Sequence, residues 1–172
     1  MPCENGLDFE MPEESESYWN LLEDIWDEQS YADGPGFIEW FYSLTKAQQV
    51  LFPTHWLCSE VYNGGFHQYF SNSTGLHAPE AMNGFRELGL DDIASIVQQS
   101  MSVFGRSFPR ERLQREQFLA SFDGNDRSEW NPFCRFDDLF YASIKIPGTP
   151  EFHDADRFSV AADKYAMAAT NK

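Results

Sequence analysis

The sequence contains no apolar run approaching the roughly 18 residues that a membrane-spanning helix needs. Its first 17 residues also lack the basic and apolar regions of a secretory signal peptide. The three cysteines, Cys3, Cys58 and Cys134, are an odd number without C-x-x-C spacing, which argues against a disulfide framework and suits a reducing compartment. We therefore expect a soluble, cytoplasmic protein.

Basic residues are absent from the first quarter of the chain. Residues 1–45 hold 12 acids and no Lys or Arg, whereas the whole chain has 28 acids, 12 bases and a net charge of -16. The remaining residues, 46–172, therefore carry a net charge of only -4. Such a polarised chain repels nucleic acid and anionic membranes, so the expected partner is a cationic protein surface.

Common enzyme signatures are also absent: the chain has no H-E-x-x-H, G-x-x-x-x-G-K, G-x-S-x-G or G-x-G-x-x-G motif. We predict a non-enzyme without a cofactor, but two chemical alternatives stay open. His55 and Cys58 share a helix face, so with one further pair of ligands they could form a metal site, or Cys58 could act as a nucleophile beside a histidine. The residues of these alternatives are His55, Cys58, Glu60, His67, His77 and Cys134.

No alternating polar and apolar run long enough for a confident strand occurs, and 16% of the residues are aromatic. At 172 residues, the chain is long enough to bury about 70% of its unfolded surface in one core. We predict a compact all-α bundle of about seven to nine helices, with an acidic arm at 1–14 and a single domain at 15–172.

Apolar periodicity and capping residues locate the helices. Thr45 and Gln48 form a capping box, and Pro53 suits the first turn of a continuing or new helix. Segment 37–44 is interpreted as helical, although its periodicity also allows a strand. Ser15 or Ser17 is available as the N-cap of the first helix, Asp91 can cap a further helix, and Pro109 marks another helix start. The expected helices are 16–30, 37–44, 45–63, 66–70, 78–89, 91–105, 109–122 (with five charges on its outer side), 133–144 and 154–170.

The helix at 16–30 would carry its apolar residues on one face and acids on the other. Glu23 with Asp27, and Asp24 with Glu28, recur at i, i+4, so carboxylates would be spaced by about 6 Å along the axis. DNA presents one phosphate per strand about every 3.4 Å of axis. Acids of this helix and its flanks could therefore replace phosphates in contacts with Lys or Arg; the candidates are Glu16, Glu23, Asp24, Asp27, Glu28, Asp33 and Glu39.

The stretch "EVYNGGFHQYFSNSTG" at 60–75 places two glycines inside a helical region. Gly64 and Gly65 can adopt dihedral angles that stop a helix, and the aromatic residues after them would return the chain to the core. We interpret the stretch as a joint between two helices in which Asn63, Gln68 and Asn72 bind open backbone groups. A ligand site using the same polar residues is the alternative.

The stretch closely resembles the E-V-x-N-G-G-F-x-Q-Y-F-x-N signature of a bacterial family of DNA mimic proteins. The resemblance extends less sharply over residues 15–170. It implies a compact helical fold and a homodimer whose acidic surface occupies the DNA-binding face of a helix-turn-helix transcription factor, without catalysis. The matching residues are Glu60, Val61, Asn63, Gly64, Gly65, Phe66, Gln68, Tyr69, Phe70 and Asn72.

A third function class is an interaction module without mimicry. Trp40, Phe41 and Tyr42 form an aromatic cluster that could bind a peptide or a second copy of the chain.

Overall fold

The computed structural model describes residues 17–26, 35–122, 131–148 and 155–171. Within these ranges helices joined by turns and short loops make up the fold and no strand occurs, which confirms the predicted all-α class and helix number. None of the helices in these ranges has the length and apolar character needed to cross a membrane. The helices are α1 (Trp19–Glu23), α2 (Pro35–Ser43), α3 (Lys46–Ser71), α4 (Ala78–Glu87), α5 (Asp91–Ser102), α6 (Arg112–Ala120), α7 (Cys134–Ile144) and α8 (Arg157–Thr170), with a 3₁₀ helix, η2 (Ser73–His77).

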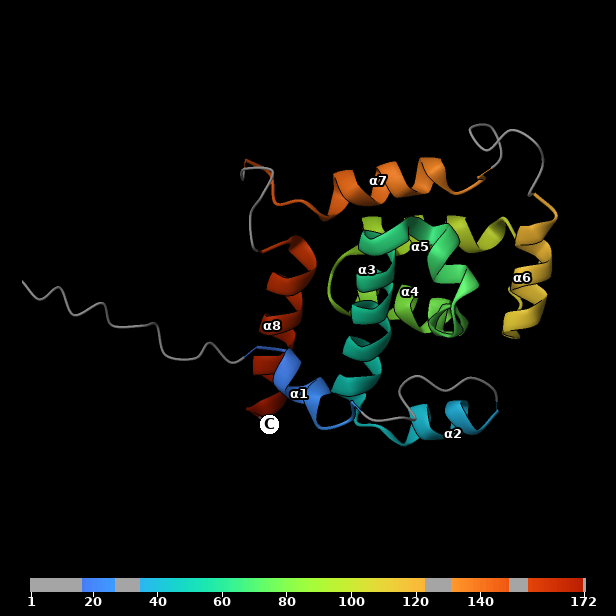
Figure 1. Cartoon of the computed structure of the whole chain (residues 1–172). Coiled ribbons are helices and arrows are strands. Elements are labelled where there is room, and N and C mark those ends of the chain that lie inside the picture. Colours follow the sequence, from blue (N-terminus) through green and yellow to red (C-terminus); the bar gives the residue numbers. More distant parts are fainter. Residues whose placement is uncertain (1–16, 27–34, 123–130, 149–154, 172) are drawn as a thin grey trace, which may run out of the picture.

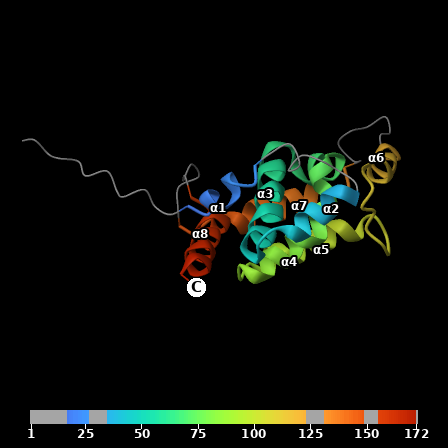
Figure 2. The ribbon, with the colours of Figure 1, turned by 90° about the horizontal axis from the view of Figure 1, so that it is seen from below.

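The long helix α3 is the central element of the bundle. It contacts α1, α4, α6, α7 and α8, so elements far apart in sequence meet on its sides. Figure 1 shows α7 across one end of α3, and α1 and α2 at the other end. Seen from below, α8 and α6 lie on opposite sides of α3 (Figure 2).

Aromatic rings fill much of the core around α3. Phe52, Phe66, Tyr69 and Phe70 of this helix are completely buried. The ring of Phe70 lies 5.1 Å, centroid to centroid, from that of Phe133 at the start of α7. Large buried rings contribute both apolar area and edge-to-face contacts, which explains how this chain stabilises one core.

The start of α3 is built as predicted. Thr45 is its N-cap, and the side chains of Thr45 and Gln48 form the complete capping box. Pro53 lies inside α3 rather than at the start of a new helix. Residues 37–43 of the segment 37–44 lie in α2 and Leu44 follows the helix, which excludes the strand alternative.

The first helix is shorter than predicted. Instead of 16–30, α1 covers Trp19–Glu23, and Trp26 is already outside it, while 27–30 lie beyond the described residues. The amide of Ile25 donates to Leu22 and that of Trp26 to Glu23, a tightened i to i−3 pattern that ends the helix. Trp26 then stacks on Trp56 of α3, with ring centroids 4.9 Å apart. Tertiary packing of the aromatic residues thus overrides the helical periodicity.

Three further boundaries differ from the prediction. The N-cap of α1 is Tyr18 rather than Ser15 or Ser17, although Ser17 Oγ accepts a hydrogen bond from the Trp19 amide at 3.3 Å. The N-cap of α5 is Leu90, so Asp91 is the first helical residue and its carboxylate lies in the first turn, where the helix dipole favours it. Helix α6 begins at Arg112 rather than Pro109, because Glu111 has an extended backbone.

Candidate functional site

The signature stretch forms a break inside α3. Gly64 (φ −159°, ψ 21°) and Gly65 (φ 73°, ψ −178°) leave helical geometry, and the helix resumes at once and continues to Ser71. The conformation of Gly65 is one that essentially only glycine adopts. The predicted joint is therefore present at the two glycines.

Helix α7 holds both sides of this break. The Phe66 amide, which opens the second half of α3, donates to Asp137 Oδ1 at 2.8 Å. On the other side, the Tyr141 hydroxyl donates to the Val61 carbonyl at 2.6 Å. A Cβ at Gly65 would lie 2.7 Å from Asp137 Oδ2, so the missing side chain is what lets the carboxylate approach.

Asp137 and Tyr141 were not among the residues predicted from the sequence, although their spacing along the chain could have indicated them. Asp137 and Tyr141 are spaced i, i+4 on α7 and share one face, beside the buried pair Phe136 and Phe140. A polar pair next to an apolar pair on one helix indicates a helix side that both packs against the core and forms hydrogen bonds.

The Glu60 carboxylate lies at the centre of a second network. It accepts hydrogen bonds from Gln68 Nε2 and Asn72 Nδ2, both at 2.8 Å, and from Thr74 Oγ1 at 3.2 Å. The prediction that Gln68 and Asn72 bind open backbone groups is therefore wrong: their side chains bind this carboxylate across the break. Asn63 is exposed, and Phe66, Tyr69 and Phe70 return to the core as predicted.

Arg115 of α6 is fully buried, which corrects its placement on the outer side of that helix. Its guanidinium donates to the carbonyls of Phe70 (2.9 Å) and Asn72 (2.8 Å) at the end of α3, and to that of Pro109 (3.3 Å). Arg115 precedes the buried Leu119 by four residues, so apolar periodicity could have revealed its inward face.

His55 and His77 lie against aromatic rings, and Cys58 is buried in the hydrophobic core. Burial lowers the pKa of His55 to about 4 and, with Arg110 and Arg115 nearby, that of His77 to about 3. Burial raises the pKa of the Cys58 thiol, which disfavours the thiolate that a nucleophile needs. Among the described residues, no three His, Cys, Asp or Glu side chains are grouped as a metal site requires. His67 is half-buried and Cys134 is exposed.

Of the three aromatic residues predicted to form an interaction surface, only Tyr42 is largely exposed. Phe41 belongs to the core, where 3% of it is exposed, and Trp40 is half-buried. Tyr42 is 60% exposed, and its hydroxyl donates to Glu80 Oε1 at 3.3 Å.

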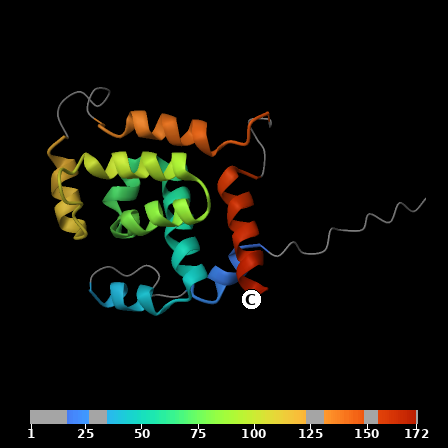
Figure 3. The same ribbon diagram turned by 180° about the vertical axis from the view of Figure 1, so that it is seen from behind.

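Three of the seven candidate carboxylates lie in the described part of the chain. Glu23 and Asp24 at the end of α1, and Glu39 on α2, are all exposed. Helices α1 and α2 lie at the same end of the molecule in opposite views (Figures 1 and 3). We expected carboxylates at regular intervals along one helix. Helix α1 does not provide this spacing, because it ends at Glu23. Glu16, Asp27, Glu28 and Asp33 lie outside the described residues.

Most other described acids are committed to contacts within the molecule. Glu80 pairs with Arg110 (2.6 Å), Asp92 with Arg157 (2.6 Å), Glu116 with Arg112 (2.9 Å) and Glu87 with Lys46 (3.8 Å). Asp163 accepts from the Tyr18 amide, and Asp156 caps α8. The exposed acids that form no ion pair with another described residue are Glu23, Asp24, Glu39, Asp91, Glu111 and Asp138.

A family of proteins described as DMP19-like matches residues 42–154, a span that includes the complete signature, the break in α3 and helix α7. Comparison with curated proteins and with solved structures gave no match.

Proposed function

Since the chain belongs to the family of DMP19-like proteins, a family of DNA mimics, we propose that it binds a basic DNA-binding protein and blocks that protein's access to DNA. The partner we infer is a helix-turn-helix transcription factor. The activity is inhibitory binding, without catalysis and without a cofactor.

The observation that carries the proposal is the end of the molecule formed by α1 and α2. Glu23, Asp24 and Glu39 are exposed there without a described cationic partner, in a part of the chain that has no Lys or Arg before Lys46. Unpaired carboxylates keep their full attraction for Lys and Arg of a partner, so they can replace phosphates. Asp27, Glu28 and Asp33 lie between them in sequence, and Glu16 just before them, so the proposal extends to all seven residues.

The direct test is displacement of labelled operator DNA from a transcription factor that co-purifies with the protein. We expect the full chain to release the operator at low salt, and its affinity for the factor to fall steeply as salt rises, because charge pairing dominates the contact. If no co-purifying factor releases its DNA, the proposal is wrong.

Charge reversal tests where the contact lies. The variant Glu23→Lys, Asp24→Lys, Glu39→Lys should displace operator at least about tenfold less well. The matched control, Asp91→Lys, Glu111→Lys, Asp138→Lys, makes the same charge change at the starts of α5 and α6 and on α7, and it should compete much more strongly than the first variant. Equal loss in both variants would indicate a net-charge effect and remove the assignment to this end of the molecule.

We further propose that the protein acts as a homodimer, which would present two such acidic ends to a two-fold symmetric factor. Light scattering of the free protein and of the complex tests this. A monomer in both would contradict it.

A further inference from the structure

A hollow of about 650 Å³ lies between α8 and the turn that joins α4 to α5. Its apolar wall comes from Leu88, Leu90, Ile146, Val160, Ala161 and Ala168. Four polar side chains complete the lining: Glu87, Arg157, Lys164 and Tyr165. This size and this mixture of many apolar and few polar groups are typical of small-molecule sites.

Both walls are fixed by contacts within the molecule. At the end of α4, the Leu90 amide donates to Phe85 (2.8 Å) and the Gly89 amide to Arg86 (3.0 Å), a Schellman turn in which Gly89 has φ 74°. On the other wall, both terminal nitrogens of Arg157 bind the Asp92 carboxylate, at 2.6 and 3.1 Å, and join α8 to α5. The hollow is therefore formed before any ligand arrives, which reduces the entropic cost of binding.

The charges around the hollow leave one cation available. Arg157 is occupied by Asp92, and the Glu87 carboxylate has Lys46 Nζ at 3.8 Å. Lys164 is exposed and lies within 4.0 Å of no carboxylate in the described part of the chain. On α8 it is one turn after Val160 and one turn before Ala168, so it belongs to the side of the helix that lines the hollow.

We infer that this hollow binds a small molecule with an apolar body and one anionic group, whose carboxylate or sulfonate pairs with Lys164. Tyr165 and Ala168 also line a neighbouring hollow of about 440 Å³ beside the start of α3. A long apolar tail can therefore extend past Tyr165. The inference does not depend on DNA mimicry, and the second hollow is also lined by Leu21 of α1.

The experiment titrates the full chain with 8-anilinonaphthalene-1-sulfonate and follows its fluorescence. We expect saturable binding of one dye per chain, displaced by decanoate but not by decylammonium, which has the same tail and the opposite charge. Tetradecanoate should compete better than octanoate because its tail reaches the second hollow.

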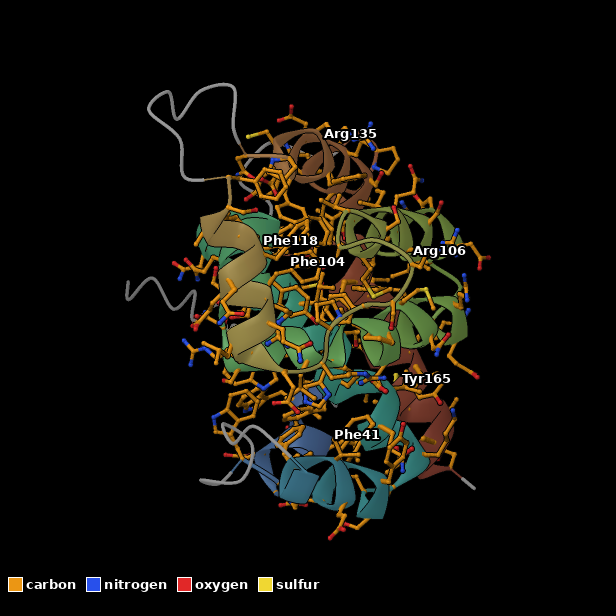
Figure 4. The ribbon with its side chains drawn as sticks, turned by 90° about the vertical axis from the view of Figure 1, so that its right-hand side faces the viewer. Phe41, Phe104, Arg106, Phe118, Arg135 and Tyr165 are labelled. Carbon is orange, nitrogen blue, oxygen red and sulfur yellow. The ribbon has the colours of Figure 1, made fainter. Side chains whose placement is uncertain are left out.

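Two variants and one control locate the site. Lys164→Glu should weaken dye and decanoate binding by about tenfold or more, the usual effect of losing a charge-assisted contact. Ala168→Trp should abolish binding by filling the space between the two hollows. Arg106→Glu makes the same charge change as Lys164→Glu at the exposed residue that Figure 4 shows apart from Tyr165, and it should bind like the parent protein.

Several results would overturn the inference. These are no saturable binding, equal competition by decylammonium, or binding that neither Lys164→Glu nor Ala168→Trp weakens. Near-ultraviolet circular dichroism must be unchanged in the variants, since the dye also binds loosened folds. If Ala168→Trp changes the oligomeric state in light scattering while dye binding persists, the face is an interface between copies and the inference is wrong.

Discussion

At the scale of single residues, Arg115 shows how a charge can serve the fold rather than a partner. It is completely buried, and its guanidinium donates to carbonyls of Phe70 and Asn72 at the end of α3. These carbonyls are at a helix C-terminus, where the dipole favours a cation and the carbonyls lack partners in the helix. One planar side chain thereby ties α6 to the end of the signature stretch.

Replacing Arg115 by Lys should lower the free energy of unfolding by about 2–4 kcal/mol, because a single ammonium cannot reach carbonyls on two segments and leaves buried acceptors unpaired. Urea denaturation measures the loss. Arg106→Lys, at an exposed position, should stay within about 0.5 kcal/mol of the parent protein. Similar small effects in both variants would contradict the role given to Arg115.

Gly65 and Gly89, two of the four described glycines with positive φ, offer a matched comparison. Gly65→Ala should lose more than about 2 kcal/mol of stability, since the new methyl group meets both a forbidden backbone conformation and the Asp137 carboxylate at 2.7 Å. Gly89→Ala should lose only about 1 kcal/mol, because nothing lies within 4 Å of its Cβ position. Thermal or urea unfolding of the two variants measures these losses. Equal losses would mean that the close approach of Asp137 to Gly65 does not add to the cost of the substitution.

At the scale of elements, the short helix α1 is held by α3 through aromatic and polar contacts. The Tyr18 hydroxyl and His55 Nδ1 lie 3.0 Å apart, and the His55 ring is 5.2 Å from that of Trp19. Asp163 of α8 accepts from the Tyr18 amide at 2.8 Å. With only five residues, α1 has little stability of its own, so these contacts determine whether the acidic end of the molecule is ordered.

Acidification should therefore destabilise the docking of α1. Burial lowers the pKa of His55 to about 4, below the unfolded value near 6.5, so the neutral ring stabilises the fold above about pH 6.5 and this contribution is lost as pH falls towards 4. Buried His77 adds a change of the same sign.

The variant His55→Phe tests this pH dependence by urea unfolding between pH 7 and 4. At pH 7 we expect the variant to be less stable than the parent protein, because the hydrogen bond is lost. As the pH falls, the free energy of unfolding should decrease less steeply in the variant than in the parent protein, with a difference in slope of up to about 1.4 kcal/mol per pH unit. Tyr18→Phe removes the same hydrogen bond but keeps the imidazole, so it should retain the parent slope. Parallel curves for all three proteins would refute the assignment.

At the scale of the whole molecule, charge is distributed unevenly between the described residues and the rest. The described residues hold 14 acids and 10 bases, a net charge of -4, out of the chain's -16. Many of those 14 acids are paired or turned inward. The charge that mimicry requires therefore depends strongly on the remaining segments, above all on the N-terminal residues.

Removing residues 2–14 should lower the negative charge of the protein without changing the stability of its fold. The deletion takes away five acids and no base, so the net charge changes from -16 to -11. If 15–172 is the folding unit, as we propose, the thermal midpoint should stay within about 4 °C of the full chain. Operator displacement should weaken and depend less on salt. A much larger loss of thermal stability would place these residues within the domain.

The sequence by itself determined what short-range chemistry controls. The Thr45 and Gln48 capping box, the break at Gly64 and Gly65 and the helical class follow from backbone preferences and apolar periodicity within a few residues. The family also follows from a contiguous motif. These features could be predicted because each depends on neighbours along the chain.

Tertiary structure decided the features that depend on distant contacts. The end of α1 is determined by Trp56, the approach to Gly65 by Asp137 of α7, and the burial of Arg115 by carbonyls of α3. The hollow beside Lys164 exists only because α8 lies next to the turn after α4. In each case the contacting residues are separated by 30 residues or more in sequence, and no local preference specifies such a pairing. These contacts form because they pack the core densely and give buried polar groups their hydrogen-bond partners.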